Sequence, residues 1–345
     1  GAFVFRQTIN RKVDLSRFTD TTRHLTNSGI PTQGIAFYHQ STLDLLQGLS
    51  CSVGLRYDYE HARCDFSKVQ QPLNGNGETK SLEQFNRSLH FGQFTPRFSM
   101  QYLSSHNQLF YASVSKGYKA GGFNVSFLNN DDYLYSPEYN WNYEIGTKLS
   151  FLNNRLSADL SLFYIDWRNQ QITNTIPTVG NVIRNAGRSR NKGIEASFQA
   201  RPTKSWMMYM NYGYTDARFV HYQKEERGIL KDYEGNYLPM VPRHTFSLTT
   251  GYSFYDICSW IDRLTLNAGV SVTGPIYWHE DNQAKQSPYA LVNLRISINK
   301  GCFTWEVWSK NLTNTDYLSY YFVTSKAYAQ KGKPITLGTS VSISL

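Results

Sequence analysis

Most of the chain alternates apolar and polar residues with a period of two, which is typical of an antiparallel β-sheet. In segment 290–298 every second residue from Ala290 to Ile298 is apolar, and the residues between them are largely polar. The same alternation runs through segments 49–59, 98–102, 143–151, 156–164, 194–200, 206–214, 246–254, 264–273 and 335–345. No long stretch has the period of about 3.6 residues that marks an amphipathic helix. The sequence therefore predicts an all-β chain of about fourteen strands.

The polar faces of these strands are unlike the charged coat of a soluble protein. They are rich in Ser, Thr, Asn, Gly and Gln, with isolated charges such as Glu144 and Asp159. A soluble sandwich hides its apolar face, whereas a membrane barrel shows that face to lipid and lines its lumen with small polar groups. Because no window of about 18 apolar residues occurs, a membrane-spanning helix is excluded. We predict an antiparallel transmembrane β-barrel.

The predicted connections alternate in length. Short turns are predicted at 104–107, 152–154, 201–204, 255–262 and 299–302. Long polar segments of roughly 15 to 25 residues are predicted at 11–32, 64–88, 118–137, 168–190, 218–243 and 311–334. Short turns on one side and long loops on the other are typical of bacterial outer-membrane barrels, with the loops outside. We therefore expect the protein to lie in the bacterial outer membrane.

Aromatic residues concentrate near the predicted strand ends. Two readings stay open for each of them: an interfacial girdle, or a large residue that packs across strands. The set comprises Tyr57, Tyr59, Tyr102, Tyr164, Trp167, Tyr214, Tyr252, Phe254 and Trp305.

Charge and cysteine content exclude several function classes. The net charge is +9, but the basic residues are scattered, so no nucleic-acid partner is expected. The four cysteines form no CxxC pair and no zinc pattern. Cys258 and Cys302 both fall in predicted turns, so they are either small apolar residues or a disulfide pair.

Signs of catalysis are nearly lacking. The sequence has no nucleophile elbow, HExxH, P-loop or Rossmann glycine pattern, and its eight His are dispersed. A site assembled across strands would leave no local spacing, so that alternative stays open. We expect a chain that is not an enzyme, with no cofactor and no metal site.

Several motifs, in order, resemble the C-terminal barrel portion of TonB-dependent outer-membrane receptors. The most specific is Ala112–Asn124, which contains Gly-Tyr-Lys-Ala-Gly-Gly-Phe-Asn and is most similar to siderophore-type receptors. The others are 54–57, 94–99, 137–138, 142–148, 162–171, 185–187, 192–195, 241–244 and 310–314.

The resemblance implies TonB-dependent transport of an iron chelate, such as a ferric siderophore. It also implies that residues 1–345 are one barrel domain, the C-terminal part of a 22-stranded barrel whose N-terminal plug is absent here. The implied partners are outer-membrane lipid, the plug of the same receptor, the TonB energy-coupling complex and a small-molecule ligand. Leu345 departs from the family, which commonly ends in an aromatic residue.

The resemblance also assigns roles to residues. Glycines on the polar faces, among them Gly54, Gly146, Gly193 and Gly338, would make room in the lumen. Inward charges would contact the plug or form ion pairs along the wall: Arg56, Arg97, Glu144, Lys148, Glu195 and Arg295. Aromatic and basic residues of the outer loops would contact the ligand: Tyr118, Lys119, Phe123, Tyr133, Tyr135, Arg184, Arg188, Arg190, His221, Tyr222, Trp278, His279, Tyr320, Tyr321 and Tyr328.

Three other functions remain compatible with the sequence. One is a self-standing outer-membrane channel for small or hydrophobic solutes. Another is a receptor of the same family for haem, cobalamin or glycans. The third is a soluble carbohydrate-binding all-β protein, which the apolar stripes disfavour.

Overall fold

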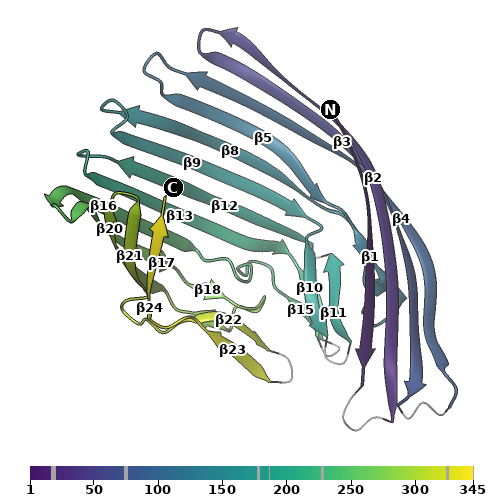
Figure 1. The fold of residues 1–345 in the computed structure, drawn as a ribbon. Helices are drawn as coiled ribbons and strands as arrows, with labels where there is room; N and C mark the ends of the chain where they lie inside the picture. The colour runs from purple at the N-terminus through teal and green to yellow at the C-terminus, as the bar shows by residue number, and fades with distance from the viewer. Residues whose placement is uncertain are drawn as a thin grey trace.

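The computed structural model describes residues 1–16, 21–73, 77–176, 179–185, 187–226, 229–323 and 326–344. Fourteen strands form one antiparallel sheet, which confirms the predicted all-β barrel wall. The sheet is strongly curved, and β1 and β24 are its two edges (Figure 1). In sheet order the strands are β1 (Ala2–Leu15), β2 (Thr22–Leu46), β3 (Leu49–Pro72), β4 (Lys80–Leu103), β5 (Leu109–Lys119), β8 (Glu138–Phe151), β9 (Leu156–Arg168), β12 (Arg188–Ala200), β13 (Trp206–His221), β16 (His244–Cys258), β17 (Ile261–Thr273), β20 (Tyr289–Lys300), β21 (Phe303–Lys310) and β24 (Thr336–Ile343).

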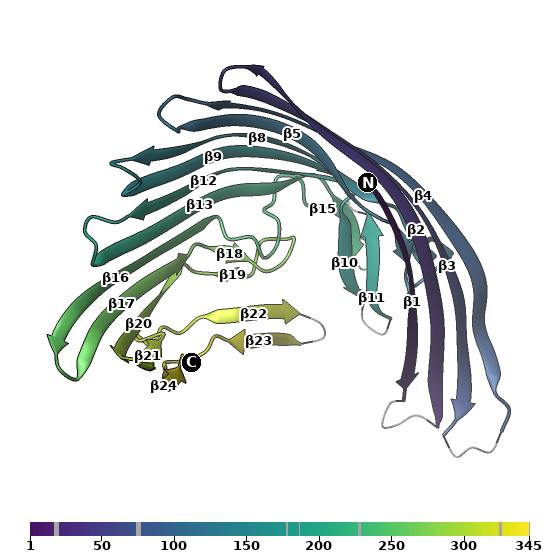
Figure 2. The ribbon, with the colours of Figure 1, turned by 45° about the horizontal axis from the view of Figure 1, so that its top comes forward.

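The long connections contain small hairpins, and all of these hairpins lie at one end of the sheet, which we call the loop end (Figures 1 and 2). They lie within the concave side of the sheet in Figure 2. The pairs are β6 (Gly122–Phe123) with β7 (Leu134–Tyr135), β10 (Gln171–Ile176) with β11 (Gly180–Asn185), β14 (Gln223–Glu226) with β15 (Ile229–Asp232), β18 (Ile276–Tyr277) with β19 (Lys285–Gln286), and β22 (Leu318–Val323) with β23 (Ala327–Lys331).

Helix is almost lacking among the described residues. A single 3-10 turn, η1 (Asn130–Tyr133), precedes β7. In the described ranges, none of the chain forms a helix long and apolar enough to cross a membrane.

The predicted loops 11–32 and 64–88 are wrong. Both lie mostly within strands, because β2, β3 and β4 have 25, 24 and 24 residues. A membrane-spanning strand needs only about 9 to 11 residues, so these strands continue well past the bilayer as a tall wall at the loop end (Figure 2). The outer face of that wall is largely polar, with Arg63, Asp65 and Ser67 on β3, and therefore no lipid-facing apolar stripe marked it in the sequence.

One predicted turn is also too long. Segment 255–262 was expected to be a turn, but β16 continues to Cys258 and β17 begins at Ile261. All four cysteines are free thiols, so Cys258 and Cys302 are not bridged. The departure noted at Leu345 lies outside the described residues.

Strand register separates two faces. On one, Ile145 pairs with Leu162 and Leu162 with Ile194, and these side chains are 59%, 52% and 43% exposed. We call this apolar, exposed face the outer face, because a barrel wall shows such a surface to lipid. The polar inner face carries the hairpins. Trp167 lies on the inner face, opposite Ser189, and not in an outer girdle.

Two buried clusters form where long connections pack on the inner face. The first joins β3 to the connection after β5 and contains Ala62, Cys64, Phe66 and Phe123. The second joins β13 to the connection after it and contains Ala217, Phe219, Tyr222, Tyr233 and Leu238. Buried apolar contact therefore holds the connections against the wall.

Aromatic side chains of neighbouring strands cover several inner-face glycines. Tyr111, Phe163 and Trp308 lie where a side chain at Gly146, Gly193 or Gly338 would project. Each aromatic is the direct cross-strand partner of its glycine. The expectation that these three glycines leave open room is therefore wrong, because the neighbouring ring fills the space.

Candidate functional site

A hollow of about 930 Å³ opens on the inner face at the loop end, between the tall wall and two connections. Arg11, His24 and Lys68 contribute basic side chains, and no carboxylate occurs among the described residues that line it. The remaining lining includes Phe66, Phe127, Gln70, Thr22, Thr26, Ser126 and Asn181. The hollow therefore combines positive charge, hydrogen-bonding groups and aromatic surface.

Sequence reasoning missed the basic residues of this hollow. Arg11, His24 and Lys68 fall in segments predicted as loops, whereas the structure places them on β1, β2 and β3. A local signal was present, since Arg11, Val13 and Leu15 alternate with Lys12 and Asp14 at strand spacing.

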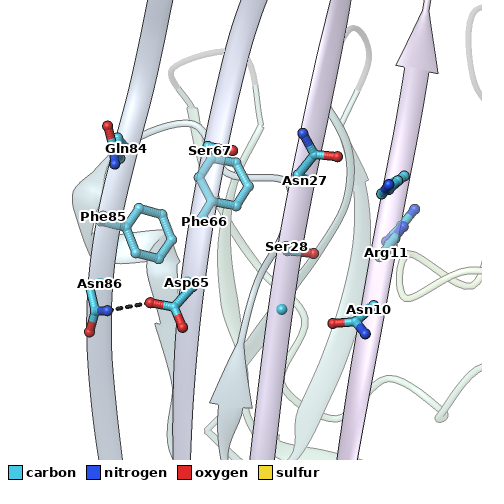
Figure 3. Close-up of a pocket in the computed structure, with 12 residues that line it drawn as sticks. Asn10, Arg11, Asn27, Ser28, Asp65, Phe66, Ser67, Gln84, Phe85 and Asn86 are labelled. Carbon is cyan, nitrogen blue, oxygen red and sulfur yellow. Dashed lines mark hydrogen bonds between the residues drawn. The ribbon is translucent and has the colours of Figure 1, made fainter.

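An adjacent hollow of about 740 Å³ lies along the same wall (Figure 3). It shares Arg11, Ser28 and Phe66 with the first hollow but also contains the carboxylate of Asp65. Asp65 accepts hydrogen bonds from Asn86 and Arg63. A carboxylate repels anions, so the first hollow suits a negatively charged ligand better.

An aromatic cluster lies beside the first hollow. Phe66 stacks on Phe85 at 4.8 Å between ring centroids, and Tyr133 stacks on Phe85 at 4.5 Å. Phe127 closes the cluster edge-on, 4.4 Å from Tyr133. The Tyr133 hydroxyl donates a 2.6 Å hydrogen bond to Glu83, which raises the pKa of the tyrosine.

An ion pair fastens the connection after β5 to the β10–β11 hairpin. Arg184 donates to both carboxylate oxygens of Asp132, at 2.7 and 2.8 Å. These hydrogen bonds lower the pKa of Asp132, although burial opposes them. Asn124 adds two bonds to the main chain of Ile183, at 2.7 and 2.8 Å.

A second aromatic cluster comes from the connections after β17 and β21. Trp278 meets Tyr320 edge-on at 6.4 Å, and His279 meets Tyr321 at 5.8 Å. Trp278 Nε1 and His279 Nε2 are buried without a hydrogen-bond partner among the described residues. Tyr328 stacks on Phe322 at 5.0 Å in the same hairpin.

The other predicted ligand contacts are dispersed. Tyr118 donates a 2.7 Å hydrogen bond to Glu60, and Lys119 lies 3.9 Å from Glu138. Phe123 and Tyr222 belong to the two buried clusters, Tyr135 covers Gly122, and His221 ends β13. Arg188 and Arg190 alternate along β12 on the same face as Ile194. They therefore lie on the outer face, away from the hollow.

The six predicted lumen charges all lie on the inner face by register. Three have partners on the wall: Arg56 binds Asp58 at 2.6 Å, Glu144 accepts from Tyr111 at 2.6 Å, and Arg295 lies 3.8 Å from Glu306. Arg97, Lys148 and Glu195 make no ion pair with any residue that the structure describes. The described part of the chain also contains no group of three or more metal-ligating side chains.

The sheet has short turns at one end and long connections at the other, an exposed apolar outer face and a polar inner face. Together these features define the wall of an outer-membrane β-barrel. The family described as TonB dependent receptor-like, beta-barrel matches residues 3–314. The chain belongs to this family. Its members are outer-membrane transport receptors and not enzymes, which confirms the expected location and the absence of an enzymatic role.

Individual relatives agree with this assignment. The Pesticin receptor of Yersinia pestis is 24% identical over 354 residues, which cover 99% of this chain and 48% of that protein. The Probable TonB-dependent siderophore receptor PiuA of Acinetobacter baumannii is 26% identical over 231 residues, or 65% of this chain and 30% of that protein. This chain therefore spans about half the length of the pesticin receptor.

A solved structure has the same fold. The ferric yersiniabactin uptake receptor FyuA from Yersinia pestis superimposes with a TM-score of 0.79 at 21% identity, covering 99% of this chain and 50% of that one.

Proposed function

We propose that the protein containing this chain imports an anionic iron chelate, of the ferric siderophore kind, across the outer membrane by TonB-dependent transport. The observation that carries the proposal is the inner hollow with Arg11, His24 and Lys68 and with no carboxylate among the described residues that line it. Basic groups offset the negative charge of a ferric chelate, and Phe66 and Phe127 supply stacking surface.

The names of relatives support the same ligand class. Among the solved structures of similar fold are a ferric yersiniabactin uptake receptor, a ferric-catecholate import receptor and a ferric citrate transporter. These proteins differ in their chelates but share a ferric ligand. A ferric chelate is therefore the ligand class that the names of these receptors share.

We also propose that the sheet is the C-terminal part of a single barrel domain of 22 strands, closed around a plug. Strands β1 and β24 are the ends of the sheet order, and open strand edges are not tolerated in hydrocarbon. Arg97, Lys148 and Glu195 would contact the plug, because charged inner-face groups need partners there. The TonB energy-coupling complex would act through that plug.

Binding measurements on the complete receptor test the proposed ligand site. The double variant Arg11→Gln with Lys68→Gln should weaken binding of a ferric tricatecholate by roughly 10- to 100-fold, because each lost charged hydrogen bond contributes about 1.5 kcal/mol or more. Quenching of intrinsic protein fluorescence measures the affinity.

The matched control is Lys12→Gln with Arg63→Gln. It removes the same charge from the same wall, but register places both residues on the outer face. Equal weakening by the two double variants would show that general charge, and not the hollow, attracts the chelate.

A further inference from the structure

The outer face carries a cluster of basic residues at the loop end of strands β5, β8, β9, β12 and β13. In one row across the sheet, Lys116 pairs with Trp141, Trp141 with Asp166, Asp166 with Arg190, and Arg190 with Arg218. Including the neighbouring rows, this outer basic band contains six cations and two carboxylates: Lys116, Arg168, Arg188, Arg190, Lys192 and Arg218 with Asp166 and Asp216.

Two pairs of arginines face each other in register within this band. Arg168 lies opposite Arg188, and Arg190 lies opposite Arg218. Like charges directly opposite one another destabilise a sheet unless an anion lies between them. The arrangement therefore calls for negative charge at this surface.

Protein carboxylates form ion pairs with only some of the cations in the band. Asp166 lies 3.0 Å from Arg168 and 2.5 Å from Arg188, and Asp216 lies 2.8 Å from Arg218. Arg190 and Lys192 are exposed and make no ion pair with a residue in the described ranges. These two cations are thus free to bind an external anion.

The depth of the band identifies the kind of anion. Tyr143 and Tyr164, directly opposite each other, lie two residues nearer the membrane centre than Trp141 and Asp166, about 7 Å along the strand. Tyrosines at the end of an apolar stripe mark the headgroup level of a bilayer. The apolar stripe of Ile145, Leu162 and Ile194 begins directly below. Headgroups of the loop-side leaflet are therefore what this surface meets.

We propose that the outer basic band is a binding site for phosphate-bearing lipid headgroups of the loop-side leaflet, with Arg190 and Lys192 as its principal ligands. Arg218 and Lys116 flank the site in the same row. The guanidinium of Arg218 also lies 4.0 Å from the ring centre of Tyr237, which holds that side chain in place. The site is independent of the inner hollow and of the chelate that the receptor imports.

Trp141 provides a reporter inside the band. The complete receptor would be reconstituted in phosphatidylcholine bilayers with phosphatidic acid whose acyl chains are brominated, because bromine quenches a neighbouring tryptophan. The quenching that disappears in a Trp141→Phe variant belongs to Trp141. We expect brominated phosphatidic acid to quench Trp141 at a lower mole fraction than brominated phosphatidylcholine does.

The decisive variant is Arg190→Gln with Lys192→Gln. It should raise the phosphatidic acid fraction that half-quenches Trp141 by about 30-fold, since each cation near a headgroup contributes a factor of about five. The control, Arg201→Gln with Lys204→Gln, removes the same charge from the exposed turn at the opposite end of β12 and should leave the value unchanged.

Three outcomes would overturn the assignment. Equal effects of the two double variants would show general charge attraction. Identical quenching by the two brominated lipids would show no headgroup preference. Release of phosphatidic acid by inorganic phosphate at comparable concentration would show that the band binds free anions and not a lipid.

Discussion

Arg184 and Asp132 form a two-pronged ion pair, 2.7 and 2.8 Å long, between connections that are 52 residues apart in the chain. Asp132 is 5% exposed, so its carboxylate depends on this partner for charge compensation. The pair holds the connection after β5 beside the hollow. It therefore sets the position of Phe127, which lines the hollow, and of Tyr133, whose ring packs against Phe127.

Arg184→Gln should loosen this part of the site without unfolding the barrel. The remaining hydrogen bonds of Asn124 are expected to hold the segment partly, so we expect a loss of roughly 1 to 2 kcal/mol in local opening free energy. Hydrogen exchange of amides 124–134 and 180–185 measures it. Unchanged exchange would show that the buried aromatic cluster alone fixes the connection.

The same pair predicts a pH dependence. Arg184 lowers the pKa of Asp132 below its usual value of 3.8. The carboxylate is therefore ionised at neutral pH in both the folded and the unfolded segment, and folding takes up no proton there. The stabilisation is present above the unfolded-state pKa and is lost as pH falls through the lower folded-state pKa. Protection of amides 124–134 should therefore stay constant down to about pH 4 and decline below it. An Asp132→Asn variant should show no such decline.

How much the sequence predicts depends on whether one face of a strand meets lipid. Strand β20 was predictable because Ala290–Ile298 shows lipid an unbroken apolar stripe. The loop ends of β1, β2 and β3 have no face that meets lipid, and polar residues interrupt the apolar ones of the inner face, such as Cys64 and Phe66, so the segments resemble loops. Arg11 and Lys68 were missed for this reason.

The predicted ligand residues lie outside the described lining of the hollow, although the structure packs several of them against one another. Trp278, His279, Tyr320 and Tyr321 were chosen as loop aromatics, and the structure brings them together. Arg188 and Arg190 were assigned to a loop because the start of β12 has no apolar residue before Ile194. The strand register, which sequence alone does not give, places both arginines on the outer face.

Thiol chemistry distinguishes the wall from the turns. Burial raises the pKa of the Cys64 thiol to about 11, and its side chain is fully enclosed at the loop end. Cys258 and Cys302 are exposed. Because the thiolate is the reactive form, we expect Cys64 to react with a maleimide at least 100-fold more slowly than Cys302. Peptide mass spectrometry after timed labelling measures both rates, and equal rates would contradict the enclosed position of Cys64.

Gly146→Ala should destabilise the barrel because the ring of Tyr111 already occupies the space that a methyl group would need. Tyr111 cannot move freely, since its hydroxyl donates a 2.6 Å hydrogen bond to Glu144. Overpacking of this kind costs about 1 to 3 kcal/mol. Thermal unfolding of the complete receptor, followed by its gel-mobility shift, measures the loss.

Gly54→Ala is the matched control for that experiment. Gly54 also lies on the inner face, but the nearest atom to an added methyl group is Arg97 Cβ at 3.6 Å, an ordinary contact. Alanine fits there and restricts the unfolded chain, so stability should be unchanged or slightly higher. If both variants lost stability equally, the backbone freedom of inner-face glycines would matter more for stability than the neighbouring aromatic ring. A loss at Gly146 alone would show that the cross-strand ring fixes glycine at that position.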